Sequence, residues 1–130
     1  MNEKKILVIE DDELNMKLVR TLLALGGYQA IEAWDAEEGI AKAHADPPDL
    51  ILMDIQLPGM DGLSATQIIK KDEALKAIPI IALTAFAMQG DDRKAIDLGC
   101  NGYITKPIDT RKFLLQIEEF MKVRISGSAK

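Results

Sequence analysis

The chain has 130 residues and a mass of 14.3 kDa, which is enough for one domain and too little for two ordinary hydrophobic cores. Its 16 basic and 21 acidic side chains give a net charge of −5, which argues against direct DNA or RNA binding because phosphates attract an excess of Lys and Arg. One cysteine, no apolar run of membrane-spanning length and no secretory signal together favour a cytoplasmic protein without membrane insertion.

Short apolar runs alternate with helical patterns along the chain. Runs without charge, typical of strands buried on both faces, lie at Ile6–Ile9, Leu50–Met53 and Ile80–Leu83. Weaker strand patterns lie at Gln29–Ala33 and Gly102–Thr105. Helical periodicity between the strands predicts helices near residues 14–25, 36–45, 63–72, 88–98 and 110–122. This repeated alternation is typical of an α/β domain with a parallel sheet covered on both faces.

Local signals indicate where some helices begin and where the domain ends. Asp35, with Glu38 three residues later, forms a capping-box pattern before the second helix. Asp109 is suited to cap the last helix. We expect one domain over residues 1–122, followed by a flexible C-terminal tail over residues 123–130, whose residues are mostly small and polar.

Strand composition also predicts the order of the strands in the sheet. The first, third and fourth strands are continuous apolar runs and are expected in the centre, whereas the second and fifth carry polar residues and are expected at the edges. Right-handed crossovers then give a doubly wound, flavodoxin-like (βα)5 sheet of order 2-1-3-4-5. Ligands in such sheets bind beyond the carboxyl ends of the strands, where the winding reverses between strands one and three.

Carboxylates gather at this predicted binding edge. The first strand leads into Glu10 and Asp11, and the third strand leads into Asp54. Asp12 follows at once, but we take Glu10 and Asp11 as the acidic pair because they directly follow the strand Ile6–Ile9, and a pair that includes Asp12 is the alternative. Clustered carboxylates repel one another and therefore imply a divalent cation, and oxygen ligands without His or Cys favour Mg²⁺ or another hard cation.

A hydroxyl and an ammonium are expected beside these carboxylates. The fourth strand ends at Thr84 and the fifth leads into Lys106. A cation held by carboxylates next to a Thr and a Lys is suited to handling a phosphoryl group. Asp54, central and beside the metal, would be the nucleophile and would form an acyl phosphate.

These residues resemble the receiver domain of two-component response regulators. The resemblance covers about residues 5–122 and is carried, in chain order, by Glu10-Asp11, by Asp54 within Leu52-Met53-Asp54-Ile55-Gln56-Leu57-Pro58-Gly59-Met60-Asp61-Gly62, by Thr84-Ala85 and by Lys106-Pro107. The chain is most similar to free-standing receivers of chemotaxis or cell-division type and to receivers of hybrid histidine kinases. The resemblance implies a phosphorelay protein that catalyses only its own phosphorylation and dephosphorylation.

The resemblance also implies roles for individual residues. Asp54 accepts phosphate from a sensor histidine kinase or a histidine phosphotransfer protein, and Mg²⁺ or Mn²⁺ is bound by Glu10, Asp11, Asp54 and the backbone carbonyl of Gln56. Thr84 and Lys106 hold phosphoryl oxygens.

The resemblance has three further implications. Tyr103 is the aromatic residue that changes rotamer, although its residue type is also consistent with edge packing. The bond between Lys106 and Pro107 is expected to be cis. Phe86 stands where rapidly dephosphorylating receivers carry a polar residue, so we expect a slowly hydrolysed acyl phosphate.

Other classes of phosphate-binding protein fit less well. A haloacid-dehalogenase-like phosphatase needs a second Asp where Gln56 stands, and the chain is too short for a substrate cap. A flavodoxin needs a neutral phosphate loop after the first strand, and a P-loop NTPase needs a Gly-Lys-Ser/Thr motif that is absent. A receiver domain excised from a hybrid histidine kinase remains as the alternative to a free-standing regulator.

Two surfaces are candidates for partner binding. The apolar residues of the first helix cover an arc wider than a core face requires, which favours kinase docking there. The face formed by the helix near 88–98, the strand carrying Tyr103 and the last helix is expected to bind a downstream protein or to form a phosphorylation-dependent homodimer. Leu115 projects from the apolar stripe of that last helix, either as a singly exposed leucine or as part of the partner surface.

Overall fold

The computed structural model describes residues 4–57, 59–84, 96–97 and 99–128. Within them, five parallel strands form one sheet of order β2-β1-β3-β4-β5. The strands are β1 (Lys5–Ile9), β2 (Gln29–Ala33), β3 (Leu50–Asp54), β4 (Ile80–Thr84) and β5 (Gly102–Thr105). The order confirms the one predicted from strand composition.

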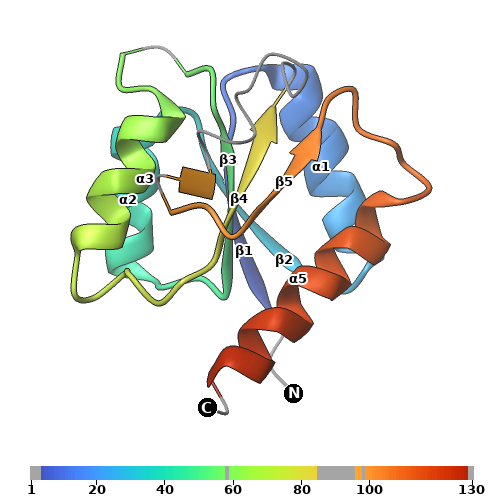
Figure 1. Ribbon diagram of the computed structural model, residues 1–130. Helices are drawn as coiled ribbons and strands as arrows, with labels where there is room; N and C mark the ends of the chain where they lie inside the picture. Colours follow the sequence, from blue (N-terminus) through green and yellow to red (C-terminus); the bar gives the residue numbers. More distant parts are fainter. Residues whose placement is uncertain (1–3, 58, 85–95, 98, 129–130) are drawn as a thin grey trace.

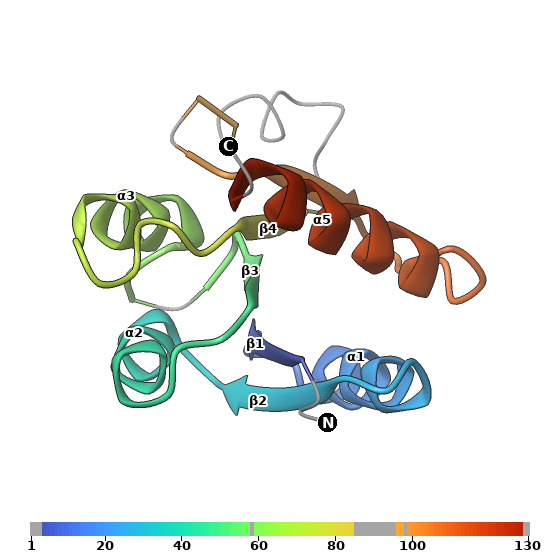
Figure 2. The same ribbon diagram turned by 90° about the horizontal axis from the view of Figure 1, so that it is seen from below.

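Helices cover both faces of this sheet (Figure 1). In the described part of the chain they are α1 (Glu13–Leu25), α2 (Ala36–Ala45), α3 (Gly62–Lys71) and α5 (Phe113–Ser128). Figure 2 shows α2 and α3 side by side on one face and α1 and α5 on the other. Most of the helix predicted near 88–98 lies outside the described residues, as do Pro58, Ala85 and Phe86.

The apolar residues divide into two clusters, one on each face of the sheet. Alternate strand residues point to opposite faces, so Ile9 and Met53 belong to the cluster beneath α2 and α3, whereas Val8 and Leu52 belong to the cluster beneath α1 and α5. The central strands β1, β3 and β4 are buried almost throughout, in accord with their uninterrupted apolar sequences.

Aspartates cap the first three of these helices. The side chains of Asp12, Asp35 and Asp61 accept hydrogen bonds from backbone N–H groups in the first turns of α1, α2 and α3. Before α2 the predicted capping box forms on one side: the Asp35 carboxylate accepts from Glu38 N–H at 2.8 Å. The Glu38 carboxylate accepts a 2.7 Å hydrogen bond from Trp34 N–H, one residue before the Asp35 N–H that a capping box uses. That hydrogen bond lowers the pKa of Glu38.

The last helix differs from its predicted bounds at both ends. Residues 110–112 form a turn instead of helix: the Asp109 carboxylate accepts a 3.0 Å hydrogen bond from Arg111 N–H, and the Asp109 carbonyl accepts from Lys112 N–H at 3.1 Å in the manner of a three-residue turn. The helix then continues to Ser128, beyond the end predicted for it at residue 122. Adding residues to an existing helix costs less than starting one, which favours this continuation.

No helix in the described ranges is both long and apolar enough to cross a bilayer.

Candidate functional site

The ends of four strands bring the predicted site residues to one edge of the sheet. Asp54 is the last residue of β3 and Thr84 the last of β4, while Glu10 follows β1 and Lys106 follows β5. Since parallel strands point in the same direction, their carboxyl ends meet at the same edge. The sheet order therefore places β1 beside β3 and β4 beside β5 around the site.

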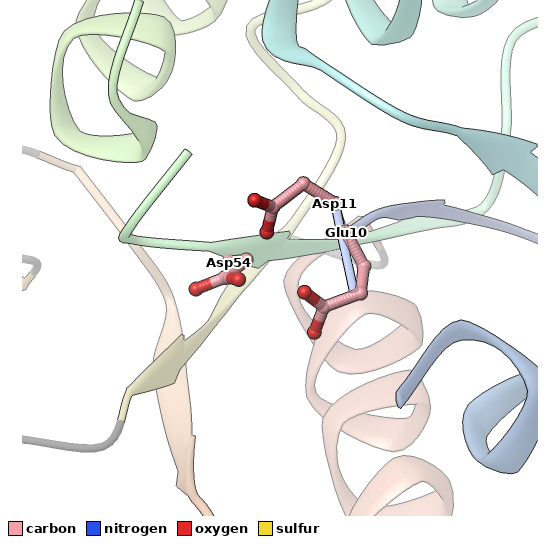
Figure 3. A group of neighbouring side chains, drawn as sticks. All are labelled: Glu10, Asp11 and Asp54. Carbon is pink, nitrogen blue, oxygen red and sulfur yellow. The ribbon is translucent and has the colours of Figure 1, made fainter. Parts of the chain in front are cut away.

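Three carboxylates lie together at this edge. One oxygen from each of Glu10, Asp11 and Asp54 lies within 4.8 Å of the others, and Figure 3 shows the three side chains around the ends of β1 and β3. Glu10 and Asp54 are buried, whereas Asp11 is exposed. Oxygen ligands at this spacing, closed on one side and open on the other, suit a hard divalent cation.

The neighbouring Asp12 is the N-cap of α1 and is not one of the three converging carboxylates. Its carboxylate accepts a 2.9 Å hydrogen bond from Asn15 N–H and so caps α1, and its own N–H donates to Glu10 Oε2 at 3.2 Å. The carboxylates that converge with Asp54 are thus those of Glu10 and Asp11. This geometry favours the Glu10-Asp11 register over one that includes Asp12.

Lys106 lies between two of the carboxylates. Its Nζ is 2.9 Å from Glu10 Oε1 and 3.1 Å from Asp54 Oδ2. Burial alone lowers the pKa of Lys106, but the close contact with the Glu10 carboxylate and the charge of Asp54 outweigh burial and raise it. The ammonium is therefore held in its charged form at the point where a phosphoryl oxygen would need a positive partner.

Glu10 is the most perturbed acid in the described part of the chain. Burial, reinforced by the neighbouring Asp54 and opposed by Lys106, raises the pKa of Glu10 to about 7. Although Lys106 Nζ lies close to Glu10 Oε1, this buried oxygen accepts no hydrogen bond of good geometry from the described residues. A buried carboxylate oxygen without a well-aligned hydrogen-bond donor is suited to bind a cation.

Both oxygens of the Asp54 carboxylate have donors. Gln56 N–H donates to Oδ1 at 3.0 Å, and Lys106 Nζ donates to Oδ2 at 3.1 Å. The backbone of Gln56 therefore lies next to the carboxylate, and the Gln56 side chain is exposed. These contacts fix the orientation of the buried carboxylate.

The remaining predicted residues lie on β4, on β5 and just after it. Thr84 is buried and pairs in register with Thr105, and Tyr103 is 40% exposed on the edge strand β5. The bond between Lys106 and Pro107 is cis, the isomer that the family resemblance implies. Sequence reasoning gave Gly62 no role of its own, yet this residue packs directly against the backbone of Asp54.

Comparison with known proteins agrees with this geometry. Residues 6–118 match the family model of the response regulator receiver domain. The polar-differentiation response regulator DivK of Brucella ovis is 46% identical over 118 residues, which cover 91% of this chain and 96% of that protein.

Two solved structures with sequence similarity have the same fold. The receiver domain of the sensor histidine kinase PA1611 from Pseudomonas aeruginosa, with a magnesium ion coordinated in its active-site cleft, has 33% identity and a TM-score of 0.86 over 93% of this chain and 99% of that one. A CheY-like response regulator receiver domain protein from Methanospirillum hungatei has 28% identity and a TM-score of 0.88, covering 97% of this chain and 99% of that one.

Proposed function

The chain belongs to the response regulator receiver family, and we propose that Asp54 is its phosphoacceptor, served by Mg²⁺, Thr84 and Lys106. As a receiver domain of two-component signalling it is not a conventional enzyme. The observation that carries the proposal is the convergence of Glu10, Asp11 and Asp54 within 4.8 Å beside the ammonium of Lys106.

In the proposed reaction an Asp54 carboxylate oxygen attacks the phosphorus of a phosphohistidine. A new O–P bond forms, the N–P bond breaks, and the electron pair of that bond leaves with the imidazole. Gln56 N–H and Lys106 orient the carboxylate before the transfer. After it, Lys106 and the Thr84 hydroxyl hold the phosphoryl oxygens.

The carboxylates of Glu10, Asp11 and Asp54, with the backbone carbonyl of Gln56, would hold the cation. Bound Mg²⁺ or Mn²⁺ supplies positive charge that offsets the negative charge developing between donor and acceptor. The coordinated magnesium in the PA1611 receiver supports this choice of ion.

The donor class follows from the family, because a receiver domain implies a histidine kinase as partner. We propose that a kinase or a histidine phosphotransfer protein docks beside α1, where Leu14 and Leu25 are 77% and 75% exposed. The 46% identity to DivK supports a DivK-type response regulator. The PA1611 receiver keeps a receiver of a hybrid kinase as the alternative.

The signal would leave by the face that carries Tyr103 and α5, toward a downstream protein or a second copy of the chain. The cytoplasmic location expected from the sequence belongs to the same proposal, since it is where such kinases expose their phosphohistidines.

Labelling with a small phosphodonor tests the proposal. Incubation with acetyl phosphate and Mg²⁺ should add one phosphoryl group, which mass spectrometry locates on Asp54. Asp54→Asn or removal of the metal should abolish the label, because the nucleophile or the offsetting charge is lost. Full labelling of Asp54→Asn would mean that another residue is the acceptor.

A further inference from the structure

The first residue of α3, Gly62, lies against the backbone of the proposed phosphoacceptor. A Cβ atom added to Gly62 would overlap the Asp54 carbonyl oxygen and would lie 2.8 Å from Ile55 Cα. These atoms belong to the main chain and cannot swing aside. By contrast, a Cβ on Gly26 would meet the end of the Leu114 side chain, 2.6 Å away.

Hydrogen bonds on both sides hold Gly62 in this position. Its N–H donates to the Ile55 carbonyl at 3.0 Å, which closes the turn between β3 and α3. Its carbonyl accepts a 2.8 Å hydrogen bond from the hydroxyl of Thr66, which is fully buried. Extra bulk at Gly62 would therefore displace the segment of Asp54 and Ile55 relative to α3.

That segment carries a donor that orients the acceptor. Gln56 N–H, the next along the chain after Ile55, donates to Asp54 Oδ1. A shift of the turn would move this N–H, and with it the carboxylate, away from the position facing Lys106. Gly62 is not one of the described glycines with a positive φ angle. The need for glycine here is therefore explained by the lack of room for a side chain and not by the backbone conformation.

We propose that Gly62 is a positioning residue for Asp54: because it lacks a side chain, the first turn of α3 seats directly on the Asp54 main chain and holds the carboxylate in its reactive orientation. This inference rests on the proposed phosphoacceptor function. It predicts that Gly62→Ala impairs phosphorylation even though alanine is the better helix former.

The test compares two glycine-to-alanine variants at the start and end of helices. Gly62→Ala should lower the rate of acetyl phosphate labelling per folded molecule by about tenfold or more, because small displacements of a reacting group are costly. Gly26→Ala, at the far end of α1, should stay within about twofold of the unaltered chain, with any loss confined to stability. A folded Gly62→Ala protein labelled at the unaltered rate would overturn the proposal.

Thr66 supplies a second pair of variants in case Gly62→Ala does not fold. Thr66→Val keeps the shape but removes the hydroxyl that holds the Gly62 carbonyl, and Thr66→Ser keeps the hydroxyl. Labelling of Thr66→Val should be about threefold slower than that of Thr66→Ser, the size expected for one hydrogen bond. Equal rates would contradict the proposal.

A readout without phosphorylation separates this inference from the function on which it rests. The amide resonance of Gln56 should shift in Gly62→Ala, or in Thr66→Val, and should not shift in Gly26→Ala. If the unaltered chain is not labelled at Asp54, the proposed function fails while the amide shifts still decide the positioning. A Gln56 resonance that does not move in either variant would refute the role of Gly62.

Discussion

At the scale of single residues, the site combines groups that oppose one another when no cation is bound. Glu10 and Asp54 approach the same ammonium, Lys106 Nζ, while Asp11 adds a third carboxylate from the solvent side. One ammonium cannot neutralise three carboxylates, so the metal-free site retains excess negative charge. A divalent cation would relieve that excess.

Metal binding should therefore stabilise the folded chain through Asp11. Mg²⁺ at about ten times its dissociation constant should add about 1.4 kcal/mol to the free energy of unfolding, or about 4 °C in melting temperature. Asp11→Ala should remove most of this response, and calorimetry with and without Mg²⁺ measures it. Asp12→Ala is the matched control, because Asp12 caps α1: it should cost about 1 kcal/mol of stability and keep the metal response. The reverse pattern would assign the cation to Asp12.

The buried Glu10 predicts a pH dependence of the metal-free protein. Its folded pKa of about 7 is above the ordinary value of 4.5, so the folded state holds the proton more tightly. Stability from this group is present below pH 4.5 and is lost as the pH rises through 7. Because Asp54 and Lys106 act on the Glu10 carboxylate in opposite directions, we expect a loss of about 1–2 kcal/mol in EDTA.

Glu10→Gln should abolish that loss, since an amide does not titrate. Urea unfolding at pH 5 and pH 8 measures the difference, with the exposed Glu119→Gln as control. An unchanged pH dependence in Glu10→Gln would show that another group causes it.

At the scale of helices and strands, a second polar cluster joins α3 to the start of β4 and β5. Lys70 Nζ donates to the Ile78 carbonyl and to Asn101 Oδ1, both at 3.1 Å. Asn101 Oδ1 also accepts a 3.0 Å hydrogen bond from Ile80 N–H. Burial lowers the pKa of Lys70, so its charge is kept there at a cost in solvation that these acceptors offset.

Removing this ammonium should destabilise the junction. Lys70→Met preserves the length of the side chain but leaves the Ile78 carbonyl without its lysine partner, which should cost about 1–3 kcal/mol. Lys71→Met, on the exposed neighbour, should change the stability by less than about 0.5 kcal/mol. Equal effects of the two variants in urea unfolding would mean that the cluster contributes no specific stability.

Much of the fold was predictable because its signals are local or depend on burial. Asp35 and Glu38 satisfy the start of α2 by themselves, and central strands must be apolar on both faces. The start of α5 was not predictable, because the Asp109 side chain binds the Arg111 N–H and forms a separate turn. In sequence, an Asp that forms a separate turn before a helix looks the same as an Asp that caps the helix.

The convergence of the candidate residues at one edge of the sheet was predictable, whereas their detailed contacts were not. Strand ends brought Glu10, Asp54 and Lys106 together through the sheet order alone. The choice between Asp11 and Asp12 depended on which carboxylate turns back to cap α1. The role of Gly62 depends on how closely α3 approaches β3, which residue spacing does not reveal.

At the scale of the whole molecule, the helices α1 and α5, which cover the same face of the sheet, both carry exposed apolar residues. Leu14 and Leu25 are exposed on α1, and Leu115 is 62% exposed on α5, as the stripe pattern of α5 predicted. Tyr103 lies on the edge strand β5, and its register partner Ala82 is two residues before Thr84 on β4. A change at Thr84 is thus one strand away from the proposed output face.

Tyr103 should be needed for output and not for phosphorylation. Phosphate on Asp54 should draw the Thr84 hydroxyl toward its oxygens, and the half-exposed Tyr103 ring can then move inward. A differential interaction of a few kcal/mol suffices to shift such a two-position equilibrium. Tyr103→Ala should therefore keep the rate of labelling at Asp54 and weaken phosphorylation-dependent binding of a partner, or dimerisation, by about tenfold.

Mass spectrometry measures the labelling of Asp54, and sedimentation of the phosphorylated protein measures its association. A second variant, Leu115→Ala, tests whether α5 is part of the output surface. Because Leu115 is exposed and lies away from the carboxylates, its loss should leave labelling unchanged and weaken association only if α5 takes part. Equal losses of labelling and association in Tyr103→Ala would mean that the ring supports the site itself. Chemical-shift changes confined to the neighbourhood of Asp54 on phosphorylation would likewise contradict this route, because the proposed coupling requires β5 to respond.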